Sequence, residues 1–129
     1  MRRAAYIDAS ALVKLVVREP ESDAVEELVL GRHLVASEVA EVEVRRAARL
    51  RGTIDERTMA EALGLVSFLS LDERARRLAA TVDPPRLRSL DAIHLATALL
   101  VDGIEEFVSY DRRLAGAARE RGLTVLSPA

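Results

Sequence analysis

AAYIDAS, the stretch at residues 4–10, decides how the rest of the chain is organised. Its first four residues form a short apolar run, and Tyr6 and Ile7 favour extended structure. An apolar run without polar alternation predicts a strand that is buried on both faces of a sheet. Asp8 ends this run, and a helix-like segment begins almost at once. Because open α/β sheets bind ligands beyond the carboxyl ends of their strands, Asp8 is the first candidate site residue.

Strand-like and helix-like segments alternate along the whole chain. Beyond the first strand, we expect strands at residues 34–36, 68–71, 107–110 and 123–126, and helices at 11–18, 21–30, 37–50, 56–68, 72–82, 89–101 and 112–121. This alternation predicts an α/β fold of three layers, with a mainly parallel central sheet wrapped by helices. We find no linker and no internal repeat, so we expect one domain over residues 1–129.

The composition limits the class of protein. Half of the residues are hydrophobic but only 3% are aromatic, so leucine, valine and alanine must build the core. The absence of cysteine excludes disulfides, thiolate metal sites and a thiol nucleophile. No apolar run approaches the roughly 20 residues that span a bilayer, and the first residues do not resemble a signal peptide. We therefore expect a soluble, cytoplasmic protein without a membrane partner.

The basic residues are almost all arginine. Lys and Arg together number 19, Lys14 is the only lysine, and the formal net charge is −2. The planar guanidinium of arginine binds phosphate through two hydrogen bonds, although a GC-rich genome would also favour arginine. If cations neutralise several acids, the remaining charge becomes positive. The acidic balance therefore does not exclude a nucleic-acid substrate.

The segment SEVAEVEVRRAARL at residues 37–50 predicts an amphipathic helix with an acid on its apolar side. Since a helix turns by about 100° per residue, its apolar residues Val39, Val42, Ala47 and Leu50 lie along one stripe. We expect this stripe to face the core. Glu43 lies in the middle of this stripe and should point inward. A lone buried carboxylate is costly unless it is paired or binds a metal. Arg46 offers the simpler alternative, a partly buried ion pair with Glu43.

Two further acids precede or begin helices. Asp91 lies in the first turn of a strongly apolar helix at residues 89–101, for which Ser89 is the candidate N-cap. Asp111 ends a strand and precedes the next helix. The simpler interpretations are a first-turn acid favoured by the helix dipole for Asp91 and a plain N-cap for Asp111. We expect His94, on the polar side of the same helix, to be structural rather than a ligand.

The expected fold brings four acids to one edge of the sheet: Asp8, Glu43, Asp91 and Asp111. In a parallel α/β sheet the strand ends and the following helix starts share this edge. So many neighbouring carboxylates cannot all ionise unless cations neutralise them. Oxygen ligands without cysteine favour Mg²⁺ or Mn²⁺ over zinc. The residues alone therefore predict a divalent metal site.

Four segments of the chain resemble a known family. They are YIDASALVKL at 6–15, SEVAEVEVRRAARL at 37–50, LRSLDAIHLATAL at 87–99 and FVSYDRRLAGAARERGLTVLSP at 107–128. In this order and spacing they resemble the PIN-domain ribonucleases and, more closely, the toxin subunits of VapBC-type toxin–antitoxin pairs. The resemblance covers essentially the whole chain.

The resemblance assigns roles to individual residues. The family's acidic quartet, whose fourth member is the most variable, matches Asp8, Glu43, Asp91 and Asp111. Ser10 and Ser109 match small hydroxyl residues beside the first and last acids, and we expect them to orient carboxylates or metal-bound water. Arg46 matches an arginine that often follows the glutamate by three residues.

The resemblance implies a metal-dependent endoribonuclease that hydrolyses RNA phosphodiester bonds and leaves 5′-phosphate and 3′-hydroxyl ends. We assign Asp8, Glu43 and Asp91 as ligands of Mg²⁺ or Mn²⁺, directly or through water, with Asp111 assisting a second ion. Few aromatic residues are available to stack on bases, so we expect recognition of RNA shape and phosphates. The candidate phosphate-binding arginines are Arg46, Arg86, Arg88, Arg112 and Arg113.

The resemblance also implies two protein partners, a cognate antitoxin that inhibits the enzyme and a second copy in a homodimer. Residues 11–17 are apolar nearly all round, with Lys14 as the only interruption. Such a segment is either buried in its own domain or covers a partner. We expect it to form part of a groove for an amphipathic helix of the antitoxin.

Three other classes of protein are weaker alternatives. A phosphatase with Asp8 as covalent nucleophile needs a second acid two residues later, where Ser10 stands. A receiver-like signalling module needs an adjacent acid pair and a late lysine, but Ala9 follows Asp8 and no lysine follows Lys14. A non-catalytic PIN scaffold remains open.

Overall fold

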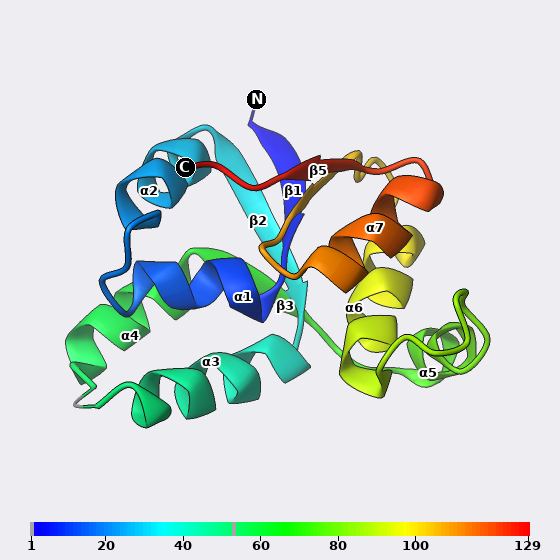
Figure 1. Ribbon diagram of the computed structural model, residues 1–129, viewed down its shortest axis with the longest axis horizontal. Coiled ribbons are helices and arrows are strands. Elements are labelled where there is room, and N and C mark those ends of the chain that lie inside the picture. Colours follow the sequence, from blue (N-terminus) through cyan, green and yellow to red (C-terminus); the bar gives the residue numbers. More distant parts are fainter. Residues whose placement is uncertain (1, 53) are drawn as a thin grey trace.

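Within residues 2–52 and 54–129, which the computed structural model describes, five parallel strands form the centre of the fold. Their order across the sheet is β3-β2-β1-β4-β5 (Figure 1). They are β1 (Arg3–Ile7), β2 (Arg32–Ser37), β3 (Val66–Leu69), β4 (Glu106–Val108) and β5 (Thr124–Leu126). All four neighbouring pairs are parallel, which confirms the predicted parallel sheet.

Helices cover the sheet on two sides (Figure 1). On one side lie α1 (Ala9–Leu12), the 3-10 turn η1 (Val13–Leu15), α2 (Ser22–Leu30), α3 (Val39–Leu50) and α4 (Glu56–Gly64). On the other lie α5 (Glu73–Ala79), α6 (Ser89–Leu100) and α7 (Arg112–Glu120). The three-layer α/β/α architecture is therefore confirmed.

Strand β1 lies in the middle of the sheet, as its apolar sequence predicts. Ala5, Tyr6 and Ile7 are completely buried. The ring of Tyr6 stacks on that of Phe107 in β4, with centroids 5.0 Å apart. Since β1 pairs with β2 on one side and β4 on the other, the residue that follows it is held at the centre of the strand ends.

The buried stripe of α3 differs from the predicted one. Ala40, Val44 and Ala48 are buried, whereas Val42 and Leu50 are 60% and 87% exposed. The helix is thus turned by about one residue, or roughly 100°. It packs against α1, and the row of small side chains spaced four residues apart, Ala40, Val44 and Ala48, lets two helices approach closely. Close backbone packing outweighs the burial of the larger apolar side chains.

The segment at residues 11–17 is not the single helix that we expected. Helix α1 ends at Leu12 and the 3-10 turn η1 follows it. Ala11, Leu12 and Val13 are buried in the core of this chain. The first part of the segment is therefore buried in its own domain and does not cover a partner.

Other boundaries move by a few residues. Strand β3 begins at Val66, opposite Leu34 of β2, so α4 ends at Gly64 and not at residue 68. The N-cap of α6 is Arg88, whose backbone is extended, and Ser89 is the first helical residue. Within residues 2–52 and 54–129, none of the helices combines the length and apolar character that crossing a bilayer needs.

Candidate active site

Asp8 lies between the end of β1 and the start of α1, and only 2% of it is exposed. Its Oδ1 accepts hydrogen bonds from the hydroxyl of Ser10 at 2.6 Å and from the backbone N–H of Ala11 at 3.2 Å. Its Oδ2 accepts from the hydroxyl of Ser109 at 2.5 Å. The two serines named from the sequence therefore both contact this carboxylate and hold it in one orientation.

Burial raises the pKa of Asp8, and the hydrogen bonds from Ser10 and Ser109 oppose that rise. The ionised carboxylate is therefore costly in the protein without a cation. Charged groups buried in this way occur mainly where they are paired or bind metals. The burial of Asp8 singles it out from the exposed acids of the chain.

Glu43 projects from α3 on the flank of the buried stripe, and 24% of its side chain is exposed. Its Oε1 lies 2.5 Å from Nε2 of His94 in α6. In the part of the chain that the structure describes, His94 is the basic partner of Glu43, and Arg46 is exposed. The expected alternative, an ion pair with Arg46, is therefore wrong. The turn of α3 that buries Ala40 and Val44 leaves Arg46 outside.

His94 is buried, with 1% of its surface exposed, and lies beside the sheet. Its Nδ1 is 2.6 Å from the hydroxyl of Tyr6. The sequence singled out Glu43 but not this contact, because residues 6, 43 and 94 are far apart in the chain. A tyrosine in an apolar run that predicts a buried strand was the available signal, since a buried phenol usually has a polar partner.

Asp91 lies in the first turn of α6, as predicted. Its pKa is raised first by burial and then by the negative charge of Asp111, with smaller contributions from Asp8 and Glu43. His94 opposes this rise. Charges shift a pKa in this way only when they lie close together. The four acids thus lie near one another: Asp8 and Asp111 follow β1 and β4, Asp91 lies in the first turn of α6, and Glu43 projects from α3.

Asp111 is also the N-cap of α7, as its simpler interpretation predicts. Its Oδ1 accepts hydrogen bonds from the backbone N–H groups of Arg113 at 3.0 Å and Leu114 at 3.1 Å. Capping leaves Oδ2 without a bond to this helix end. The two roles are therefore compatible.

The donor set fits a divalent cation. Within residues 2–52 and 54–129, no three Asp, Glu or His side chains are already arranged around a single point as metal ligands are. The pKa values of Asp8 and Asp91 are nevertheless raised by burial, and that of Asp91 also by its acidic neighbours. A bound cation favours the ionised carboxylates and removes this cost. Carboxylate oxygens suit Mg²⁺ or Mn²⁺.

Comparison with known proteins identifies the family. The chain matches the PIN domain over residues 5–120. It belongs to the PIN-domain family. It is 44% identical to ribonuclease VapC46 of Mycobacterium tuberculosis (strain ATCC 25618 / H37Rv) over 128 residues, which cover 97% of this chain and 98% of that protein.

Two further ribonucleases of Mycobacterium tuberculosis (strain CDC 1551 / Oshkosh) are similar over most of the chain. VapC35 is 37% identical over 129 residues, and VapC47 is 37% identical over 131 residues. In both, the match covers 95% of this chain and 96% of the relative. The resemblance noted in the four sequence segments is confirmed, and the phosphatase and receiver alternatives are excluded.

A basic hollow lies along α7, the helix that Asp111 caps in this PIN domain. It has a volume of about 520 Å³ and is lined by Arg86, Arg112 and Arg113, with Leu87, Ala117 and Glu120 among its other residues. Arg112 and Arg113 belong to the first turn of α7, directly after Asp111. Of the other candidate arginines, Arg88 and Arg46 are exposed but do not line the hollow.

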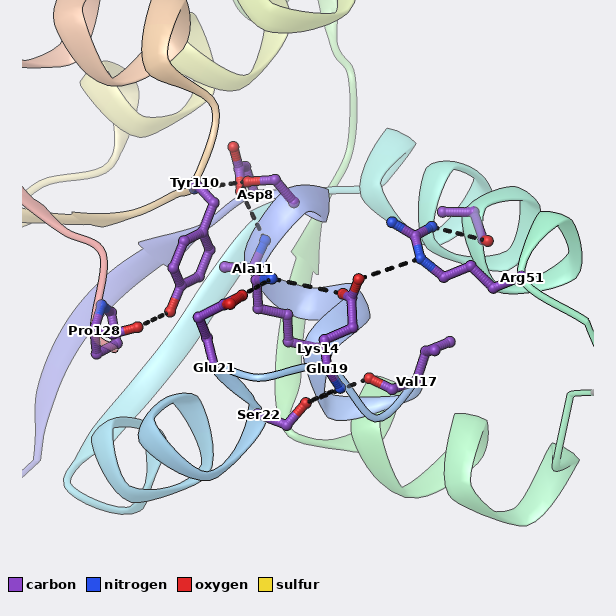
Figure 2. Close-up of polar contacts among 12 residues, drawn as sticks. Asp8, Ala11, Lys14, Val17, Glu19, Glu21, Ser22, Arg51, Tyr110 and Pro128 are labelled. Atoms are coloured by element: carbon purple, nitrogen blue, oxygen red, sulfur yellow. Dashed lines mark hydrogen bonds and ion pairs between the residues drawn. The ribbon is translucent and has the colours of Figure 1, made fainter.

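Figure 2 shows a second group of polar contacts next to Asp8 that the sequence analysis missed. The Nζ of Lys14 lies 2.6 Å from Oε1 of Glu21 and 4.6 Å from the ring centroid of Tyr110. Glu19 joins Lys14 to Arg51 at the end of α3, with distances of 3.6 and 3.4 Å. The only lysine of the chain is thus an internal ion-pair partner, and its isolation in an apolar segment was the available signal.

The last residues of the chain are fastened to the loop that carries Ser109 and Asp111. The hydroxyl of Tyr110 donates to the backbone carbonyl of Pro128 (Figure 2). The hydroxyl of Ser127 donates to the carbonyl of Ser109 at 2.5 Å. These contacts fix the backbone around Ser109, whose side chain holds Asp8.

Proposed function

We propose that this chain, a ribonuclease of the VapC family, is an endoribonuclease that hydrolyses RNA phosphodiester bonds at the four-acid cluster and depends on Mg²⁺ or Mn²⁺. The observation that supports the proposal most is the coupling among the acids. Asp111, Asp8 and Glu43, which come from separate elements, all raise the pKa of Asp91, and this supports a shared acidic site. Such a group of acids is costly without a cation.

Asp8, Glu43 and Asp91 are the proposed ligands, directly or through water, with Asp111 assisting a second ion. A bound divalent ion would supply an activated water and charge neutralisation at the phosphate. The protein itself holds the acids in place. Ser10 and Ser109 each donate to a different oxygen of Asp8, so its carboxylate keeps one orientation. The expected products carry 5′-phosphate and 3′-hydroxyl ends.

The basic hollow is the proposed path of the RNA backbone. Arg86, Arg112 and Arg113 line it next to the acidic cluster, and each is exposed. Guanidinium groups bind phosphates through paired hydrogen bonds. Arg88 and Arg46 lie outside the hollow and are proposed as outer contacts. Phosphate contacts of this kind give affinity without base readout.

An antitoxin and a second copy of the chain are the proposed protein partners. Of the expected segment at residues 11–17, only Leu15 lines an open apolar hollow. The other residues that line this hollow come mainly from α2 and are Asp23, Glu26, Glu27, Val29, Leu30 and Leu65. The three acids among them suit an antitoxin helix that has one basic and one apolar face. Light scattering of the chain alone tests the proposed homodimer.

Replacement of Asp8 tests the activity. Asp8→Asn keeps the shape of the side chain and its N-cap role but removes the negative charge. We expect Mn²⁺-dependent RNA cleavage to fall by about 100-fold or more. Mutating a residue that only hydrogen-bonds to a metal ligand already costs about 10- to 100-fold in metal affinity or activity. Asp102→Asn, at an exposed acid, is the matched control and should cleave normally. Cleavage by Asp8→Asn at the wild-type rate would refute the site.

A further inference from the structure

The structure contains a buried hydrogen-bond chain that ends at one of the proposed metal ligands. We propose that His94 is a positioning residue that holds the carboxylate of Glu43 at the acidic cluster. This inference rests on the proposed function, because it assigns His94 a task toward the proposed cation site. It concerns a residue that the sequence analysis left as structural.

The chain of hydrogen bonds begins at the sheet backbone and crosses four elements. The backbone N–H of Ser37, at the end of β2, donates to the hydroxyl oxygen of Tyr6 in β1 at 2.9 Å. The Tyr6 oxygen lies 2.6 Å from Nδ1 of His94 in α6, and Nε2 of His94 lies 2.5 Å from Oε1 of Glu43 in α3. Ser37, Tyr6 and His94 are at most 1% exposed.

The two ends of this chain, a backbone N–H and a carboxylate, restrict its donor and acceptor roles. A backbone N–H can only donate, so the Tyr6 oxygen accepts from Ser37. Its own proton is then free to be donated to Nδ1 of His94. A carboxylate oxygen only accepts hydrogen bonds, so Nε2, the nitrogen that faces Glu43 at 2.5 Å, carries a proton. The contact is a hydrogen bond from Nε2–H to the carboxylate.

This arrangement makes His94 a support for a ligand and not a ligand itself. Nδ1 is engaged by the Tyr6 hydroxyl, and Nε2 bears a proton directed at Glu43, so neither nitrogen offers a lone pair to a cation. One oxygen of Glu43 is held by the bond, and Oε2 remains for a cation. Donors of this kind orient metal ligands and typically change affinity 10- to 100-fold.

The rigidity of the support comes from the core. The ring of Tyr6 stacks on Phe107 at 5.0 Å and meets the ring of His94 edge-on at 5.7 Å. Without this hydrogen bond, Glu43 would be a flexible side chain on a partly exposed flank of α3. The hydrogen bond therefore gives a flexible carboxylate the fixed position of a sheet residue.

Two variants that differ only in reach test the role. The amide of His94→Gln extends about as far as Nε2, so it can still donate to Glu43, whereas His94→Asn extends only about as far as Nδ1. We expect His94→Asn to weaken Mn²⁺ binding, measured by calorimetry, 10- to 100-fold, and His94→Gln to stay within a few-fold of wild type. His33→Asn, at the exposed second histidine, is the control.

A double-mutant cycle separates positioning from general structural support. In a Glu43→Gln background, His94→Asn should cause no further loss of Mn²⁺ affinity, because the ligand that it positions is already changed. An equal loss in both backgrounds would refute the inference. Circular dichroism of each variant monitors folding.

The wild-type protein provides a test that does not depend on any variant folding. Long-range ¹H–¹⁵N spectra report which imidazole nitrogen carries the proton, and the chain has only two histidines to assign. We expect a proton on Nε2 of His94, and an Nε2 without a proton would overturn the inference. If the wild-type protein binds no Mn²⁺, the proposed metal site itself fails. If it binds and His94→Asn binds equally well, only the role of His94 fails.

Discussion

Asp8 combines a structural and a chemical role in a single side chain. It caps α1 through the N–H of Ala11, and its two oxygens accept from Ser10 and Ser109. A nearly buried charge with a raised pKa weakens the folded state, because the unfolded chain ionises this group more easily. The fold therefore gives up some stability at this position to bury a carboxylate, which is consistent with the proposed role of Asp8 as a metal ligand.

Removing this charge should stabilise the metal-free protein. Because the folded pKa of Asp8 is raised, its contribution to the free energy of unfolding falls as pH rises from the unfolded value of about 3.9 through the folded value. We expect metal-free Asp8→Asn to melt a few degrees higher than wild type at pH 7, and the difference to vanish near pH 3. Thermal denaturation in EDTA measures both. A lower melting temperature at pH 7 would show that the charge is stabilising.

At the scale of elements, β2 and β4 are joined across β1 near their amino ends. Glu106 in β4 is buried and accepts hydrogen bonds from Arg32 in β2 at 2.8 and 3.2 Å. Arg3 in β1 lies 3.4 Å from the same carboxylate but is 63% exposed. The hydrogen bonds from Arg32 lower the pKa of Glu106. The amino end of the sheet therefore holds a structural ion pair. The four candidate site acids lie toward the opposite end of the sheet.

Glu106→Gln should destabilise the protein by about 2 kcal/mol, because it leaves the Arg32 guanidinium without its charged partner. A lowered folded pKa means that the charge stabilises the fold above the unfolded value of about 4.3 and that this contribution is lost as pH falls through the folded value. Urea denaturation at pH 7 and pH 3 should therefore show a difference from wild type that shrinks in acid. Arg3→Ala, at the exposed partner, should cost less than about 0.5 kcal/mol.

At the scale of the whole molecule, acids and arginines are segregated around one edge of the sheet. The acidic cluster and the basic hollow meet at the start of α7, where Asp111 is followed by Arg112 and Arg113. The net charge of −2 conceals this separation. This separation suits the proposed function, in which an anionic RNA backbone binds beside a cation site.

The basic hollow should determine how RNA binding depends on salt. On the Asp8→Asn background, which prevents cleavage, each of Arg86→Ala, Arg112→Ala and Arg113→Ala should reduce the slope of log affinity against log salt by about 1. Fluorescence anisotropy with a labelled RNA measures this slope. Arg57→Ala, at an exposed arginine of α4, should leave it unchanged. Equal slopes in all the variants would place the RNA elsewhere.

The identity of most elements could be predicted from local patterns, because each pattern reflects a local preference. The apolar run before Asp8 became β1, and Asp111 became an N-cap as its simpler interpretation predicts, since capping uses only nearby backbone groups. Helix α3 was predicted, but its buried face was not. Which face is buried depends on the neighbour that it meets, here α1.

By itself, the sequence determined the alternation of strands and helices, the family, and the four acids as candidates, since these follow from local chemistry and from residue order. Only the tertiary structure decided which side chains meet. It joined Glu43 to His94 instead of Arg46, placed Tyr6 behind that histidine, and gathered distant arginines into one hollow. Such pairings are set by how helices and strands pack in three dimensions, and a residue's own neighbours in the sequence carry almost no information about them.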